Sequence, residues 1–273
     1  MLLNLSMTRS ACVLVLAAGT TAQAAMPEAL KYVPSDTSAY VIVPDLGKLI
    51  EDLSATNQAL AGKLPPEAAQ LGMGLFFAQM IATQPGVTTN GSAAVMFEID
   101  EDQPEPDVMA ILPIEDLDAF AKGPFMSGQN ASFNGDVLEA MSGEGDPVYM
   151  RDIGDFVVAG STAEKVKAFK PGDWIGATKT ALGDAGLRSV ESGDLTLIVD
   201  IASFDEQISD MMENAEQQVN FMAMMGGGEP LNQGFAMFKQ AVDVIKRDGS
   251  VAVVSFDTGG EGIAMDAGVC FRG

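Results

Sequence analysis

The same order of predicted strands and helices occurs twice in this chain, and this repetition constrains the fold more than any other feature. The turn and strand at Asn90 to Asp100 (NGSAAVMFEID) align with those at Asp248 to Thr258 (DGSVAVVSFDT), with identical Gly, Ser, Ala and Val residues at an offset of 158. The strands that end at Val43 and Val199 open the two copies at an offset of 156. The pattern predicts an internal duplication rather than a solenoid, which needs three or more short units. Two unrelated strands with common turn chemistry are the alternative.

The first copy covers about residues 35–114. Tyr40 to Val43 form a short apolar run rich in strand-forming residues, and Pro44 ends it because proline has no N–H to donate. Asp45 is suited to cap a helix that carries leucines and an isoleucine at helical spacing. A second helix is predicted after residues 65–66. The strands 92–99 and 107–114 then form a hairpin.

The second copy covers residues 191–273 and begins with a strand at 194–199. Two helices follow, and they are predicted to pack as an antiparallel hairpin. The first has an apolar stripe with the period of 3.6 residues: Phe204, Ile208, Met211, Ala215, Val219 and Met222. The second, which begins near Pro230, has its stripe at Leu231, Phe235, Phe238, Val242 and Ile245. The strands 250–256 and 262–271 complete the copy.

The segment between the copies occurs only once. It has three short strands, at 137–141, 147–151 and 155–161, which predict a meander. The predicted fold class is α+β: two related β-α-α-β-β halves with largely antiparallel curved sheets, helical hairpins on one face, and a central β-meander. The halves are residues 25–190, with the meander inserted, and residues 191–273.

Residues 1–24 have the order of a secretory signal peptide. Arg9 precedes the short apolar run from Ala11 to Gly19, and Ala22-Gln23-Ala24 follows as a small-x-small cleavage site. Nine apolar residues are too few to span a bilayer, which takes about 20. Cleavage near Ala24 and a periplasmic or secreted protein without an integral membrane segment are therefore expected. A retained anchor is the alternative, and the true start is Met1 or Met7.

Composition excludes several classes of function. The chain has no histidine, so neither Ser-His-Asp catalysis nor an imidazole metal ligand is available. Lys and Arg number 15 against 38 Asp and Glu, a net charge of -23, which disfavours nucleic acid as a partner. After cleavage Cys270 is the single cysteine, so the mature chain has no internal disulfide.

The stretch from Pro34 to Leu46 (PSDTSAYVIVPDL) resembles the opening of a group of uncharacterised exported bacterial proteins, which also begin P-x-D-T-x-A-Y-V. The resemblance is specific over this stretch and loose over the rest of the chain. It implies a location in the bacterial envelope or outside the cell. It supplies no catalytic residues, because the group has no known activity.

Methionines and phenylalanines of the second-copy helices are the candidate ligand-binding residues: Met211, Met222, Met224, Met225, Phe235 and Phe238. Three glycines (226–228) follow this methionine-rich helix end, which suggests a pliable apolar lid over an apolar ligand. Copper binding by the thioethers is a weaker alternative. The acidic loop 98–107 fails as an EF-hand, because Gln103 stands where the turn needs glycine and Met109 where the bidentate Glu belongs. No catalytic residue, metal ligand or cofactor is assigned.

These observations favour an exported, non-enzymatic binding or envelope protein that holds an apolar small molecule or a protein partner. The alternative is a carboxylate-based, metal-dependent hydrolase that uses Asp45, Asp116 and Asp200. Each of these aspartates follows a predicted strand, where helix capping is the commoner role. A purely structural envelope protein is a third possibility.

Overall fold

The computed structural model describes residues 26–60, 79–98, 107–141, 145–172, 174–222, 228–259 and 262–271. Its strands are β1 (Ala39–Val43), β2 (Ala93–Glu98), β3 (Asp107–Leu112), β4 (Ser132–Asn134), β5 (Val137–Met141), β6 (Pro147–Asp152), β7 (Val157–Gly160), β8 (Leu195–Asp200), β9 (Gly249–Gly259) and β10 (Gly262–Phe271). Its α-helices are α1 (Leu46–Leu60), α3 (Leu117–Ala121), α4 (Ala163–Ala168), α5 (Trp174–Ser192), α6 (Asp205–Met222) and α7 (Gly228–Asp248). Its 3-10 helices are η1 (Glu28–Lys31), η3 (Met126–Gly128) and η4 (Ile201–Phe204).

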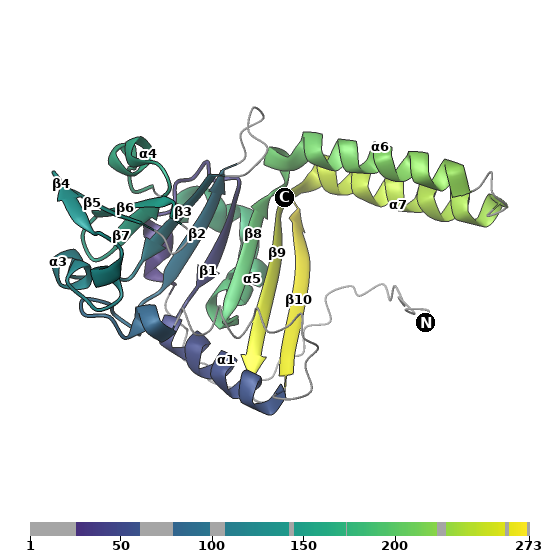
Figure 1. The fold of residues 1–273 in the computed structure, drawn as a ribbon. Helices are drawn as coiled ribbons and strands as arrows, with labels where there is room; N and C mark the ends of the chain where they lie inside the picture. Colours follow the sequence, from purple (N-terminus) through teal and green to yellow (C-terminus); the bar gives the residue numbers. More distant parts are fainter. Residues whose placement is uncertain are drawn as a thin grey trace.

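One ten-stranded antiparallel sheet forms the centre of the fold, in the order β10-β9-β8-β1-β2-β3-β7-β6-β5-β4 (Figure 1). The fold class is α+β, as the sequence predicts. The predicted meander is present as β5, β6 and β7. It extends the same sheet, because β7 pairs with β3.

The strands of the two predicted copies lie next to each other in the middle of the sheet. β1 and β8 are antiparallel neighbours, with Val41 opposite Leu197, and β2-β3 and β9-β10 continue outward on either side. At the offset of 156, Ala39 of β1 corresponds to Leu195 of β8. Phe97 lies opposite Ala39 and Phe256 lies opposite Leu195, so Phe97 and Phe256 correspond. This offset is 159, so the alignment at 158 is wrong by one residue in this strand: Val95 and Val253 lie on opposite faces. A slip of one residue moves every side chain to the other face.

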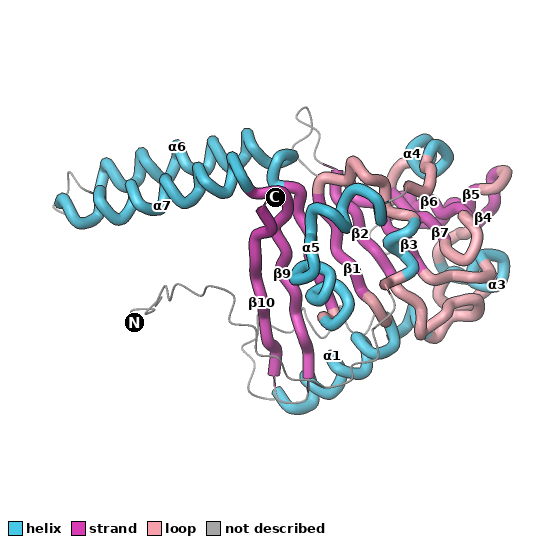
Figure 2. Tube along the Cα trace, turned by 180° about the vertical axis from the view of Figure 1, so that it is seen from behind, coloured by secondary structure: helices cyan, strands magenta, loops and turns pink. Residues whose placement is uncertain are grey.

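The main core lies between one face of the sheet and the elements α5, η1 and α4. Tyr40, Ile42, Met96, Ile111 and Ile198 are buried there. Side chains of α5 complete the cluster: Leu182, Leu187 and Val190. Figure 2 shows α5 in front of the strands on this side.

The helices α6 and α7 do not lie on a face of the sheet. They run side by side and project away from it, and they meet the other elements through η4, β9 and β10 at their base. The sequence predicts a helical hairpin on one face of the sheet, and the structure does not place α6 and α7 there.

Candidate functional site

The second face of the sheet is as apolar as the face that α5 covers. In the middle of the strands from β10 to β3, the side chains that alternate onto it are Met265, Ala267, Val269, Phe256, Val254, Ala252, Leu195, Leu197, Val199, Val43, Val41, Ala39, Ala93, Val95, Phe97, Leu112, Ala110 and Val108. None of these side chains is charged or polar, and Thr258, which follows on β9, is bound by Asp194 at the end of the strand. Antiparallel sheets commonly place polar residues on one face, so this composition indicates that something apolar belongs there.

Two groups of residues cover the margins of this second face. On one margin, Leu49 of α1 packs on Val43 and Ala93, together with Leu46 and Leu53. On another margin, α3 and η3 cover strands β5, β6 and β7 through a cluster that includes Phe120 and Met126. Between these margins the face is only half-buried. We call this middle part the apolar trough, and its floor is Val41, Val95, Phe97, Leu197, Val199 and Val254.

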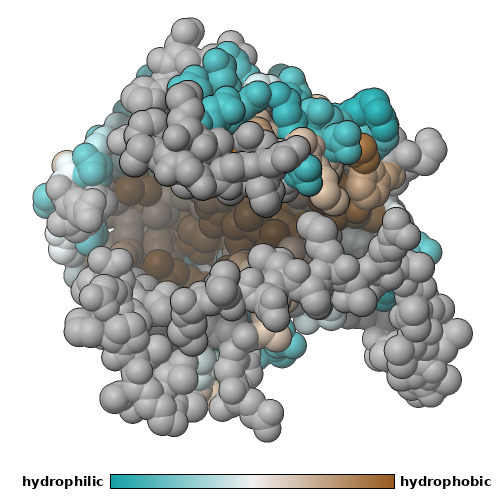
Figure 3. Space-filling model, turned by 90° about the vertical axis from the view of Figure 1, so that its right-hand side faces the viewer, coloured by the Kyte–Doolittle hydropathy of each residue, from teal (hydrophilic) through white to brown (hydrophobic). Residues whose placement is uncertain are grey.

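The floor of the trough forms continuous rows across the strands. Val41 lies opposite Leu197 on one side and opposite Val95 on the other, and Val254 lies opposite Leu197. With strands about 4.8 Å apart, the floor extends over roughly 14 Å from β9 to β2, and its two rows lie roughly 7 Å apart along the strands. Figure 3 shows a hollow in the molecule whose visible interior is hydrophobic. Exposed apolar surface of this kind marks a site for a ligand or a partner.

A buried carboxylate fixes α1 at the margin of the trough. Asp194 is buried, and its carboxylate accepts hydrogen bonds from the backbone N–H of Thr258 (2.6 Å) and from the Thr258 hydroxyl (2.9 Å). Lys48 of α1 donates to the other oxygen of Asp194 and also pairs with Asp52 (2.7 Å). The network therefore ties α1 to the start of β8 and the end of β9.

These contacts change the acid–base behaviour of both partners. Burial alone would raise the pKa of Asp194, but the hydrogen bonds from Lys48 and Thr258 outweigh burial and lower this pKa below its usual 3.8. The hydrogen bonds to Asp194 and then to Asp52 raise the pKa of Lys48 above its usual value. The ion pair therefore stays charged at neutral pH.

We expect the free energy of unfolding to decrease at acid pH because of the ion pair between Asp194 and Lys48. Because the pKa of Asp194 is lower in the folded than in the unfolded chain, its contribution is complete above about pH 4 and is lost as the pH falls through the folded value. Urea unfolding of the wild type and of the Asp194→Asn variant between pH 3 and pH 7 measures this. The difference in unfolding free energy should shrink below pH 4. A constant difference over this range would contradict the assignment.

The predicted ligand-binding residues that the structure describes differ in their exposure to solvent. Met211 is 61% exposed, and Met212 is buried in the contact between α6 and α7 instead, so the prediction that Met211 belongs to the buried stripe is wrong. Phe235 is half-buried and its ring lies 6.4 Å from that of Phe238, which is exposed. Met224 and Met225 lie outside the described residues, as does the side chain of Met222.

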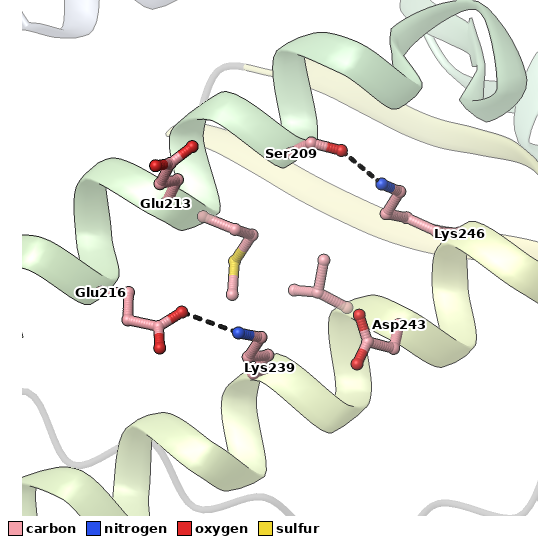
Figure 4. A pocket seen from close by; sticks show the side chains of 8 residues that line it. Ser209, Glu213, Glu216, Lys239, Asp243 and Lys246 are labelled. Carbon is pink, nitrogen blue, oxygen red and sulfur yellow. Dashed lines mark hydrogen bonds and ion pairs between the residues drawn. The ribbon is translucent and has the colours of Figure 1, made fainter.

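The helical hairpin has a small pocket of its own, of about 290 Å³, between α6 and α7. Figure 4 shows Lys239 directed at Glu216 and Lys246 directed at Ser209 across it. These contacts are 2.7 and 2.6 Å long. The pocket has an apolar centre and a charged rim, formed by Ser209, Met212, Glu213, Glu216, Lys239, Val242, Asp243 and Lys246. It is the seam that holds the two helices together.

The three aspartates of the hydrolase alternative do not form a common site. Asp45 accepts a hydrogen bond from the Lys48 N–H (2.9 Å), Asp116 from the Ala119 N–H (2.8 Å), and Asp200 from the Ala202 N–H (3.2 Å). Each aspartate therefore caps the helix that follows it. Asp45 and Asp200 lie at opposite ends of β1, roughly 20 Å apart. Within the described ranges, no three His, Cys, Asp or Glu side chains gather as a metal site requires.

Cys270 and the acidic loop have structural roles where they are described. The Cys270 thiol is half-buried on the α5 face, donates to the Leu182 carbonyl (3.1 Å), and has a pKa raised by burial. The ends of the acidic loop, Glu98 and Asp107, both pair with Lys165 of α4. The rest of the loop lies outside the described residues.

The comparisons with known proteins return no relative. No family model matches the chain, and neither the curated proteins nor the solved structures include a significant match. In the part of the chain that the structure describes, every helix is too short or too polar to cross a bilayer. The function is therefore argued from the site alone.

Proposed function

We propose that this chain is an exported, non-enzymatic binding protein that holds the hydrocarbon chain of an apolar ligand in the apolar trough. The observation that carries the proposal is a sheet face whose middle is apolar from β10 to β3 and yet only half-buried at its centre. A protein with a net charge of -23 has ample polar residues for a surface that meets only water. Apolar side chains in this position indicate an occupant that removes them from water.

The size and shape of the trough favour a small ligand over a protein partner. Its floor covers roughly 100 Å², from about 14 Å by 7 Å. A stable protein interface buries about 800 Å² on each partner. Ligand sites are mostly apolar, and the floor of the trough is a continuous apolar strip. The floor is also about as long as one acyl chain in a bilayer leaflet, which spans about 15 Å.

Export is part of the proposal and rests on the sequence. The order of Arg9, a short apolar run and Ala22-Gln23-Ala24 supports cleavage near Ala24. The resemblance of residues 34–46 to exported bacterial proteins supports the same destination. A periplasmic or secreted protein would meet lipids at the surfaces of the envelope.

An internal duplication is also part of the proposal. It is supported by the matching order of β1-β2-β3 and β8-β9-β10, and by their arrangement on either side of the antiparallel β1–β8 pair. Copying one such unit and pairing the two first strands would double the width of the apolar face. The trough would then be the joint product of both copies.

Binding of an uncharged alkyl series tests the proposal. We expect N-phenylnaphthylamine to gain fluorescence with the purified protein, and fatty alcohols to displace it with an affinity that rises about fourfold per added methylene, because burial of one CH₂ contributes about 0.8 kcal/mol. The affinity should rise up to the length of the trough and then level off.

Two results would reject apolar-ligand binding. One is the absence of any fluorescence gain together with a clean apo mass after mild extraction. The other is an affinity that does not depend on chain length, which would assign the signal to non-specific adsorption. Bovine serum albumin and an acidic protein without an apolar trough serve as positive and negative controls.

A further inference from the structure

We propose that the ligand of the trough is a lipid with a neutral or zwitterionic head group, and that anionic lipids and free fatty acids are excluded. This inference rests on the proposed function and adds the chemical class of the head group. The inference follows from the apolar side chains on the floor of the trough and from the charged side chains at its rim.

The floor of the trough offers contact only to hydrocarbon. Its side chains are apolar, and the paired strands engage the backbone N–H and C=O groups of β8, β1 and β2 on both sides. A head group placed on the floor would lose its hydration and gain no hydrogen bond. The head group of a bound lipid must therefore lie at the rim, next to the charged residues there.

The described cations at the rim are already neutralised by carboxylates. Lys48, beside the α1 margin, has two carboxylate partners, Asp52 and Asp194. This cluster has a net negative charge, so an anionic head group would have to displace a carboxylate before it could bind Lys48.

Lys246, near the base of the hairpin, follows the same pattern. It pairs with Asp205 (2.9 Å) and donates to the Ser209 hydroxyl (2.6 Å). The whole chain adds to this local repulsion, with 38 acidic residues against 15 basic ones. Repulsion of this kind acts over about 10 Å at 0.1 M salt, so it reaches a head group at the rim. Zwitterionic and uncharged head groups do not experience it.

The test compares two lysolipids that share one acyl chain, lysophosphatidylcholine and lysophosphatidylglycerol, as competitors of N-phenylnaphthylamine below their critical micelle concentrations. At about 50 mM salt we expect lysophosphatidylcholine to bind at least about tenfold more tightly. The ratio should fall toward one at about 0.5 M salt, where charges are screened within a few ångströms. Equal or tighter binding of lysophosphatidylglycerol at low salt would overturn the inference.

Two variants distinguish the effect of a carboxylate at the rim from the effect of the net charge of the protein. Asp52→Asn removes one carboxylate from the Lys48 cluster, and Glu28→Gln removes one from the Lys31 pair in η1, which lies under the opposite face of the sheet. We expect the discrimination to decrease about twofold or more in Asp52→Asn and to stay within error in Glu28→Gln. Equal effects of the two variants would overturn the assignment to the rim. If no probe binds to the wild type, the proposed function itself fails, whereas binding of both lysolipids with equal affinity rejects only the head-group preference.

Discussion

Replacement of Leu197 by Glu is expected to abolish ligand binding, with a loss of at least about a hundredfold in affinity for N-phenylnaphthylamine and for lipids. Leu197 lies in the middle of the trough floor, between Val41 and Val254. A carboxylate there would be buried without a partner by any bound hydrocarbon chain. Fluorescence titration of the wild type and the variant measures the effect.

Two further variants control this prediction. Leu197→Met keeps an apolar side chain of similar volume and should bind within about threefold of the wild type. Phe133→Glu places the same charge on β4, at the far edge of the sheet, where the ring is 45% exposed, and should leave binding unchanged. If Leu197→Glu unfolds the protein, Leu197→Trp fills the trough without adding charge and should weaken binding in the same direction. Wild-type affinity in a folded Leu197→Glu variant would place the site elsewhere.

The second large effect concerns stability. We expect Asp194→Ala to lower the free energy of unfolding by about 2–4 kcal/mol, because it leaves the Thr258 N–H buried without an acceptor and removes the buried one of the two carboxylates that pair with Lys48. In a chain of this size the melting temperature should fall by about 5–15 °C. Differential scanning calorimetry at pH 7 measures both quantities.

The matched control for Asp194 is the other carboxylate that Lys48 contacts. Asp52 is closer to solvent, and Asp52→Ala should cost less than about 1 kcal/mol, as is usual for ion pairs near the surface. If the two alanine variants were equally stable, the buried position of Asp194 would have no energetic role. A loss in Asp194→Ala that persisted at pH 3 would point instead to lost packing.

Strands and turns of this chain could be predicted from the sequence because their signals are local. The runs that contain Val41, Val95 and Leu197 are short, apolar and bounded by Pro, Gly or Asp residues, and each is a strand in the structure. Their placement in one sheet is not a local property. The pairing of β1 with β8 joins residues 156 positions apart, and no turn specifies it.

The apolar trough did have a signal in the sequence. Strands with one solvated face alternate between apolar and polar residues, whereas 39–43 (AYVIV) and 93–97 (AAVMF) are continuously apolar. Such runs indicate two apolar faces. Among the described residues, helices cover only the margins of the second face, so its apolar middle is suited to an occupant.

The error at Met211 also has a physical cause. Met211 and Met212 lie three and four residues after Ile208, and both spacings fit a helical stripe. Met212 is the one that lies between α6 and α7, and residue spacing alone does not choose between the two. Within α6 alone, the buried and half-buried apolar residues are Ile208, Met212, Ala215 and Val219.

The position of β8 also determines when the sheet can close. Until residues 195–200 have left the ribosome, β1 has one neighbour, β2, and its other edge offers unpaired N–H and C=O groups. Chains shortened before residue 195 would keep this edge together with both apolar surfaces of the sheet, the combination that promotes aggregation. Closing such a long loop also slows folding. Newly made chains would therefore depend on chaperones until their last quarter is available.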